Sequence, residues 1–155
     1  MTAELMPIQG YDYIEYYVGN ARQAAYYYGK AFGFSVVAYA GPETGVRDRV
    51  SYVLEQNAIR LVITGATRAE SDVARHQYFH GDGIKDVAFT VPDAEGAYRV
   101  ALERGAKSVR QPGVDEDEHG KLVSASIQAY GETIHTFVDR SNYSGAFAPG
   151  FVARD

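Results

Sequence analysis

An internal repeat constrains the fold of this chain more strongly than any other feature of its sequence. The segment YIEYYVGNARQAAYYYGKAFGF, which begins at Tyr13, aligns with DVAFTVPDAEGAYRVALERGAK, which begins at Asp86, at an offset of 73 residues. A repeat of this size indicates that one supersecondary unit has been duplicated. We therefore expect the two halves of the chain to contain the same elements in the same order.

Each copy opens with the pattern of a strand followed by a helix. Apolar residues alternate with a period of two, which is typical of a strand with one buried face. They are Ile14, Tyr16 and Val18 in the first copy and Val87, Phe89 and Val91 in the second. Asn20 and Asp93 then lie at equivalent places as helix N-caps, because their side chains can accept hydrogen bonds from first-turn amides. Apolar residues at helical spacing follow each cap, and Gly33 and Gly105 supply the C-terminal stops.

Three further strand-like runs follow each predicted helix. They cover residues 34–40, 49–56 and 59–64 in the first copy, and residues 106–110, 121–129 and 133–139 in the second. Residues 41–45 and 111–120 are rich in glycine, proline and acidic residues and are predicted to be loops. Residues 66–80 contain a predicted connecting helix. Both repeats, residues 10–64 and 83–139, therefore have the element order βαβββ.

This order predicts an α+β fold in which the two tandem βαβββ units form one curved mixed sheet with the helices on its outer face. With 155 residues, 46% of them hydrophobic, the chain has enough apolar material for a single domain spanning residues 1–155. The absence of cysteine excludes disulfides and thiolate metal sites. A net charge of −5 without a basic cluster argues against nucleic acid or an anionic membrane as the partner. No long apolar run or signal sequence is present at the start, so we expect a cytoplasmic protein.

The strand alternation also predicts which side chains face away from the helices and line a concavity. Those predicted to line a ligand cavity are Tyr11, Tyr13, Glu15, Tyr17, Asp86 and Thr136. The duplicated pattern resembles the vicinal oxygen chelate superfamily, which includes the glyoxalases and bleomycin resistance proteins, and whose metal ligands lie on the first and last strands of each unit. The corresponding positions here are Tyr13, Val62, Asp86 and Thr136. A non-heme iron site requires two histidines and a carboxylate, and this set has one carboxylate and no histidine. We therefore expect no metal, cofactor-binding or catalytic residue in this chain.

Each of the four histidines has a structural interpretation. His76 and His80 are separated by four residues, which can put both rings on one helix face, and without a third ligand they are predicted to be a solvated surface pair. His119 lies in the acidic segment VDEDEHG and is expected to be exposed. His135 is expected to point to the opposite face from Thr136 as a hydrogen-bonded structural residue.

Whole segments carry a closer resemblance. VGNARQAAYYYGKAFGF, VAYAGPETGVRDRVSYVLEQNAIRLVIT, HGDGIKDVAFTVPDA and AYGETIHTFVDR resemble the amino-terminal domain of bacterial 4-hydroxyphenylpyruvate dioxygenases. The resemblance implies an enzyme of tyrosine catabolism that converts 4-hydroxyphenylpyruvate and oxygen to homogentisate and carbon dioxide. It also implies that Fe(II) is bound by a carboxy-terminal catalytic domain, into which the tail at residues 140–155 would lead. On this interpretation the chain is inactive alone, and its partners are that domain and a second copy in a homo-oligomer.

Three alternatives stay open at this point. The chain is similar enough to 4-hydroxymandelate synthases, which share the substrate and iron, to be half of such an enzyme. A free-standing member of the superfamily could bind an aromatic small molecule through Tyr11, Tyr13, Tyr17 and Glu15. A metal-dependent lyase or isomerase could use Glu15 and Asp86 as ligands or bases.

Overall fold

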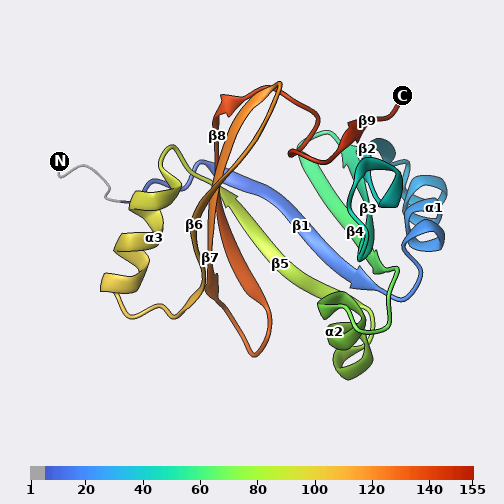
Figure 1. The fold of residues 1–155 in the computed structure, drawn as a ribbon, viewed down its shortest axis with the longest axis horizontal. Coiled ribbons are helices and arrows are strands. Elements are labelled where there is room, and N and C mark those ends of the chain that lie inside the picture. Colours follow the sequence, from blue (N-terminus) through green and yellow to red (C-terminus); the bar gives the residue numbers. More distant parts are fainter. Residues whose placement is uncertain (1–5) are drawn as a thin grey trace. The chain divides into compact units, whose positions relative to one another are not determined.

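The computed structural model describes residues 6–155, which form two compact units. The first-repeat unit comprises residues 13–85 and 150–155, and the second-repeat unit comprises the described residues up to 12 together with residues 86–149. Strands β1 (Gly10–Val18) and β5 (Gly83–Thr90) contribute residues to both units. Figure 1 shows the course of the chain through these elements.

The first-repeat unit has the predicted βαβββ order. After β1 come α1 (Ala21–Phe32), β2 (Ser35–Ala40), a short 3-10 helix (Pro42–Thr44), β3 (Arg49–Gln56) and β4 (Ile59–Ala66). Strand β1 pairs in parallel with β4, whereas β4, β3 and β2 pair antiparallel. The order of the strands is β1-β4-β3-β2-β9, with β9 (Val152–Ala153) on the outer edge. Helix α1 lies against β3 and β4 (Figure 1).

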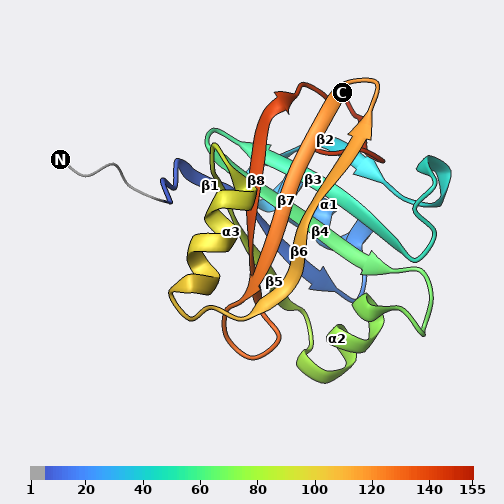
Figure 2. The same cartoon turned by 60° about the vertical axis from the view of Figure 1, so that its left-hand side comes forward.

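The second-repeat unit repeats this arrangement. Strand β5 is followed by α3 (Ala94–Glu103), β6 (Ser108–Asp117), β7 (Gly120–Gln128) and β8 (Ile134–Tyr143), and the order of the strands is β6-β7-β8-β5. Strand β5 pairs in parallel with β8, as β1 does with β4. Figure 2 shows α3 beside the β6, β7 and β8 strands. The prediction of duplicated βαβββ units with mixed sheets is thus confirmed within each unit.

The predicted caps at Asn20, Asp93 and Gly33 are confirmed, whereas α3 ends before Gly105, with Arg104 as its C-cap. The side chain of Asn20 accepts a hydrogen bond from the Gln23 amide, and Asp93 accepts one from the Gly96 amide. Gly33 ends α1 in the left-handed conformation, with φ of 77°, a region that glycine enters without steric cost.

Each helix buries its apolar stripe against its own repeat. Around α1 the buried core consists of Val18, Ala21, Ala25, Leu54, Leu61 and Ile63. Around α3 it consists of Val91, Ala94, Ala97, Tyr98, Ala101, Ala125 and Phe137. The apolar alternation in the first strands therefore faces the helices, as the sequence indicates.

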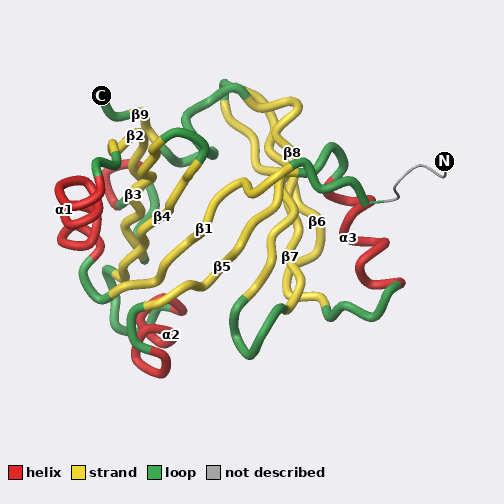
Figure 3. Tube along the Cα trace, turned by 180° about the vertical axis from the view of Figure 1, so that it is seen from behind, coloured by secondary structure: helices red, strands yellow, loops and turns green. Residues whose placement is uncertain are grey.

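Two predicted boundaries were wrong. The loop predicted at residues 111–120 is mostly strand, because β6 continues to Asp117 and pairs with β7. The connecting helix, α2 (Asp72–His80), lies within the predicted segment 66–80, with Ser71 as its N-cap. Strand β8 extends to Tyr143, four residues into the predicted tail, and β9 lies within that tail. Figure 3 shows these strands and helices by type. None of the helices in residues 6–155 has the length and apolar character needed to cross a bilayer.

Candidate functional site

A buried chain of polar side chains lies on the face of the first-repeat unit that points away from α1. Thr64, on β4, donates to the Glu15 carboxylate on β1 at 2.7 Å, and shares a 2.7 Å hydrogen bond with the Ser51 hydroxyl on β3. Ser51 and Thr64 lie directly opposite each other in the β3–β4 register. Both hydroxyls are buried, so their mutual bond and the carboxylate satisfy groups that would otherwise be costly to remove from water.

The second-repeat unit contains the same arrangement. Thr136, on β8, donates to Asp86 Oδ2 at 2.6 Å and shares a 2.8 Å hydrogen bond with Ser126 on β7. In both units the acid bonds the threonine that lies two residues beyond its own partner in the parallel strand pair, since Glu15 opposes Val62 and Asp86 opposes Ile134. The carboxylates are not at equivalent positions of the repeat, because Asp86 corresponds to Tyr13.

These contacts decide what the four expected ligand positions can bind. Val62 and Thr136 are buried, and the Thr136 hydroxyl donates to Asp86. The set consists of a phenol, an aliphatic side chain, one carboxylate and a hydroxyl. It contains no imidazole, so it does not fit the two-histidine, one-carboxylate site of non-heme iron.

A second polar cluster surrounds Tyr17, two residues beyond Glu15 on β1. Arg49 donates to the Tyr17 hydroxyl at 3.2 Å and forms a 2.9 Å ion pair with Asp48. Burial lowers the pKa of Arg49, but the hydrogen bond to Asp48 and the contact with Tyr17 outweigh it and raise this pKa above its ordinary value. The same hydrogen bond lowers the pKa of Asp48. The Lys85 ammonium nitrogen lies 6.0 Å from the centre of the Tyr17 ring.

The structure corrects the interpretation of the histidine pair on α2. His76 is buried, with 7% of its surface exposed, and its ring lies edge-on to the Tyr17 ring at 5.4 Å. Only His80 is exposed. The prediction of a solvated pair was therefore wrong for His76, because its ring packs against that of Tyr17 on β1.

The other two histidines lie as predicted. His135 Nδ1 is hydrogen-bonded to the Val87 carbonyl at 2.9 Å, and its ring lies 5.1 Å from that of Phe89. The side chain of His119 is about half exposed, at 52%.

Tyr11 lies on the opposite face from the one predicted. It is 71% exposed, and its ring contacts Phe89, which packs with the α3 core. Asp12 takes the inward place instead. Its carboxylate accepts from Thr90 at 2.9 Å and forms a two-bond ion pair with Arg140, each bond 2.8 Å long.

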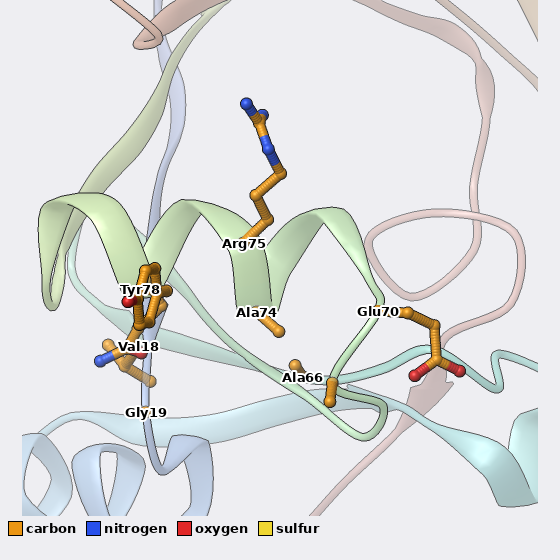
Figure 4. Close-up of a pocket in the computed structure, with 9 residues that line it drawn as sticks. Val18, Gly19, Ala66, Glu70, Ala74, Arg75 and Tyr78 are labelled. Atoms are coloured by element: carbon orange, nitrogen blue, oxygen red, sulfur yellow. The ribbon is translucent and has the colours of Figure 1, made fainter.

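Two grooves open on the first-repeat unit. The larger, of about 640 Å³, lies between α2 and the ends of β1 and β4 and is lined by Val18, Gly19, Ala66, Ala69, Glu70, Ala74, Arg75, Gln77 and Tyr78. Figure 4 shows Tyr78 beside Val18, Glu70 towards the other end, and Arg75 projecting from the opposite side of the helix to Ala74. The smaller groove, of about 420 Å³, is lined by Tyr16, Tyr27 and Tyr28 together with residues near Asn20 and Asp82.

None of the residues predicted to line a ligand cavity lines either of these grooves. Several residues that line the larger groove are glycine or alanine. In a sequence, small residues at helical spacing usually indicate only ordinary helix packing. Sequence reasoning therefore had no signal for it, because the groove arises from where α2 docks.

Comparisons with known proteins give the family. The family model described as the amino-terminal part of hydroxyphenylpyruvate dioxygenase matches residues 3–148. The 4-hydroxyphenylpyruvate dioxygenase of Dictyostelium discoideum is 48% identical over 94% of this chain, and that of Yarrowia lipolytica is 40% identical over 98%. In both cases the chain spans only 40% of the relative's length.

Solved structures agree with the fold. A mutant of 4-hydroxymandelate synthase from Streptomyces coelicolor superimposes with a TM-score of 0.84 at 30% identity, covering 96% of this chain and 43% of the synthase. Methylmalonyl-CoA epimerase from Mycobacterium tuberculosis, at 17% identity, gives a TM-score of 0.68 over 89% of this chain and 91% of its own. These likenesses confirm the vicinal oxygen chelate fold. Because the family model matches almost the whole sequence, the chain belongs to the family of amino-terminal domains of hydroxyphenylpyruvate dioxygenases.

Proposed function

We propose that this chain is the amino-terminal structural part of a 4-hydroxyphenylpyruvate dioxygenase, and that Fe(II) is bound by residues outside it. The observation that carries the proposal is the donor set at Tyr13, Val62, Asp86 and Thr136, which does not fit iron. The chain is 48% identical to the Dictyostelium dioxygenase and spans 40% of the length of that enzyme. The whole enzyme would convert 4-hydroxyphenylpyruvate and oxygen to homogentisate and carbon dioxide. No step of that reaction is assigned to a side chain of residues 1–155.

The role of this part is then to fold and to support the iron-binding part. Buried acid, threonine and serine side chains occupy the inward strand faces in both units, where other members of the fold place ligands. Each hydroxyl bridges two neighbouring strands, so these contacts fix the strand register and leave no imidazole in place for a metal. This arrangement supports a structural rather than a catalytic role.

The experiment compares the isolated chain with a chimera in which it replaces the matching region of the Dictyostelium enzyme. Oxygen uptake with 4-hydroxyphenylpyruvate and iron content are measured for both. We expect no uptake and no stoichiometric iron for the isolated chain, and turnover for the chimera. Turnover by the isolated chain, or a well-folded chimera that binds iron and is inactive, would contradict the proposal.

Half of a 4-hydroxymandelate synthase is the second candidate, and it rests on the 0.84 TM-score to such a synthase. The dioxygenase is favoured because the curated relatives reach 40–48% identity, against 30% for the synthase. Product analysis of the enzyme encoded by the full reading frame distinguishes homogentisate from hydroxymandelate.

Two further expectations accompany this function. We propose a cytoplasmic location for the enzyme, which cell fractionation tests. Self-association is favoured by the exposed aromatic side chains of α1, namely Tyr26, Tyr27 and Phe32. Sedimentation velocity over a range of concentrations should detect a dimer or larger species, and a single monomeric boundary throughout would contradict it.

A further inference from the structure

Helix α2 places two imidazole rings together. His76 and His80 are four residues apart, so one helical turn brings them to the same face. Their ring centroids are 4.5 Å apart, and the ring planes are tilted by 42°. Two neutral imidazoles at this spacing on a helix are a recognised pair of ligands for divalent transition metals.

The first of these rings is held in place before any ligand arrives. His76 is 7% exposed and lies edge-on to the Tyr17 ring at an interplanar angle of 90°. Tyr17 is itself fixed, because Arg49 donates to its hydroxyl. A fixed, largely desolvated ligand loses little freedom on metal binding. The exposed His80, in the last turn, leaves the pair accessible from solvent.

The spacing of the rings selects among metals. A metal lies about 2.0 Å from an imidazole nitrogen, which puts the ring centre roughly 3.2 Å from the metal. Two such rings are about 4.5 Å apart when the ligand angle is 90°, and about 5.2 Å apart when it is tetrahedral. The observed 4.5 Å matches the right-angled geometry. That geometry belongs to square-planar and octahedral ions, whereas Zn²⁺ prefers a tetrahedral site.

We propose that His76 and His80 form a two-imidazole site for Cu²⁺ or Ni²⁺, with water completing the coordination. Cu²⁺ is expected to bind more tightly than Ni²⁺, since affinity for nitrogen ligands rises in that order. Zn²⁺ is expected to bind more weakly than Cu²⁺, because the affinity of nitrogen ligands falls from Cu²⁺ to Zn²⁺. The site needs no substrate and no iron, so it stands independently of the proposed function.

The test is calorimetric titration of the chain, free of any affinity tag, with CuCl₂, NiCl₂ and ZnCl₂. We expect one Cu²⁺ per chain, and at least about tenfold weaker binding after His80→Asn or His76→Asn, since even the loss of a supporting hydrogen bond costs that much at metal sites. His119→Asn is the matched control, because this exposed histidine lies in the β6–β7 turn of the second-repeat unit and is not part of the pair. Its affinity for Cu²⁺ should stay unchanged.

The electron paramagnetic resonance spectrum of the Cu²⁺ complex gives a second readout. In the parent chain, hyperfine splitting of the Cu²⁺ signal should arise from two imidazole nitrogens. In His80→Asn it should arise from one. His80 is exposed, so this variant should keep its circular dichroism spectrum even if His76→Asn does not fold. Equal losses of affinity in the His80 and His119 variants, or unchanged binding in His80→Asn, would overturn the proposal.

Discussion

Asp12 anchors the start of β1 to β8 through a buried charge. Its side chain is 1% exposed and that of Arg140 is 20% exposed, and the two form a two-bond ion pair. Removing one partner of such a pair leaves an uncompensated charge in a poorly solvated place. We expect Asp12→Ala to lower the free energy of unfolding by about 3–5 kcal/mol in urea denaturation.

The control for this prediction is Glu103→Ala, which breaks the exposed pair with Arg99 on α3. Exposed pairs of this kind contribute little, so a change below about 0.5 kcal/mol is expected. The double variant Asp12→Ala with Arg140→Met should lose less than the sum of the single changes. Additive losses would show that the pair is not coupled.

The hydroxyls of the buried threonines Thr64 and Thr136 are expected to stabilise the fold. Thr64→Val and Thr136→Val each remove a hydroxyl that bridges a serine and a carboxylate. The free energy of unfolding of each variant should be lower by about 1–3 kcal/mol, because the substitution leaves buried polar groups without a hydrogen-bond partner. Ser144→Ala, which removes an exposed hydroxyl bonded to the His119 carbonyl, serves as the comparison. If both valine variants are as stable as the parent protein, the hydrogen-bonded side chains around Thr64 and Thr136 do not have this structural role.

The stability of the fold should depend on pH through two tyrosines, Tyr39 and Tyr143. Burial, followed by hydrogen bonds to Glu43 and Asp117, raises the pKa of Tyr39 and of Tyr143 to about 12. In the unfolded chain a tyrosine ionises near its ordinary value of about 10. The stabilisation is therefore complete below pH 10 and is lost as the pH rises through 12.

Absorbance titration of tyrosinate should detect both late-ionising groups, and Tyr39→Phe and Tyr143→Phe should each remove one. Tyr130→Phe, at an 84% exposed position, should leave both. An unchanged late phase in Tyr39→Phe would contradict the assignment.

For single residues, the sequence predicted features that depend on neighbours close in the chain, but not those that depend on distant residues. Asn20 and Asp93 were identified as caps because a cap bonds an amide three residues away. The face of Tyr11 was predicted wrongly because Asp12, beside it, is drawn inward by Arg140, 128 residues further along the chain. The burial of His76 likewise depends on β1, which lies far from α2 in the sequence.

At the scale of the element, the C-terminus of α1 offers a matched pair of glycines. Gly33 has φ of 77°, and an added Cβ would also meet Gln56 Nε2 at 3.1 Å. Gly29 lies inside the helix with room for a Cβ. We expect Gly33→Ala to lower the free energy of unfolding by about 1 kcal/mol and Gly29→Ala to raise it by up to about 1 kcal/mol. Thermal and urea unfolding measure both, and effects of the same sign would contradict the assignment of Gly33 as the cap.

Strand β6 shows why an element can escape sequence analysis. Its residues are mostly exposed, and it contains Pro112, Gly113 and a run of acidic residues, so its composition predicts a loop. Pairing with β7 nevertheless holds it as an edge strand with shifts of register. Charged residues and bulges are common on edge strands because they discourage pairing with other chains. Composition alone therefore predicts a loop, and the strand becomes evident only from its pairing with β7.

At the scale of the molecule, the repeat and the long segment resemblances predicted the fold and the family, because both depend on order along the chain. The polar chains at Glu15 and Asp86 were not predicted, because they require the register between parallel strands. The same dependence explains the grooves. Their lining combines the ends of strands with a helix whose docking position has no local signature.

The last segment of the chain returns to the first-repeat unit and suggests a whole-chain test. Strand β9 pairs with β2, the Arg154 amide donates to the Val37 carbonyl at 2.9 Å, and the Arg154 guanidinium lies 4.7 Å from the centre of the Tyr39 ring. Deleting residues 150–155 exposes the outer edge of β2, so its amides should exchange with deuterium faster.

Amides of β7, in the second-repeat unit, serve as the internal reference and should keep their exchange rates after the deletion. Arg154→Gln separates the two kinds of contact, because it removes the charge over Tyr39 and keeps the backbone pairing. We expect this variant to change β2 exchange far less than the deletion, since main-chain hydrogen bonds rather than the cation–π contact protect amides. Unchanged β2 exchange in the deletion variant would show that β9 does not protect this edge.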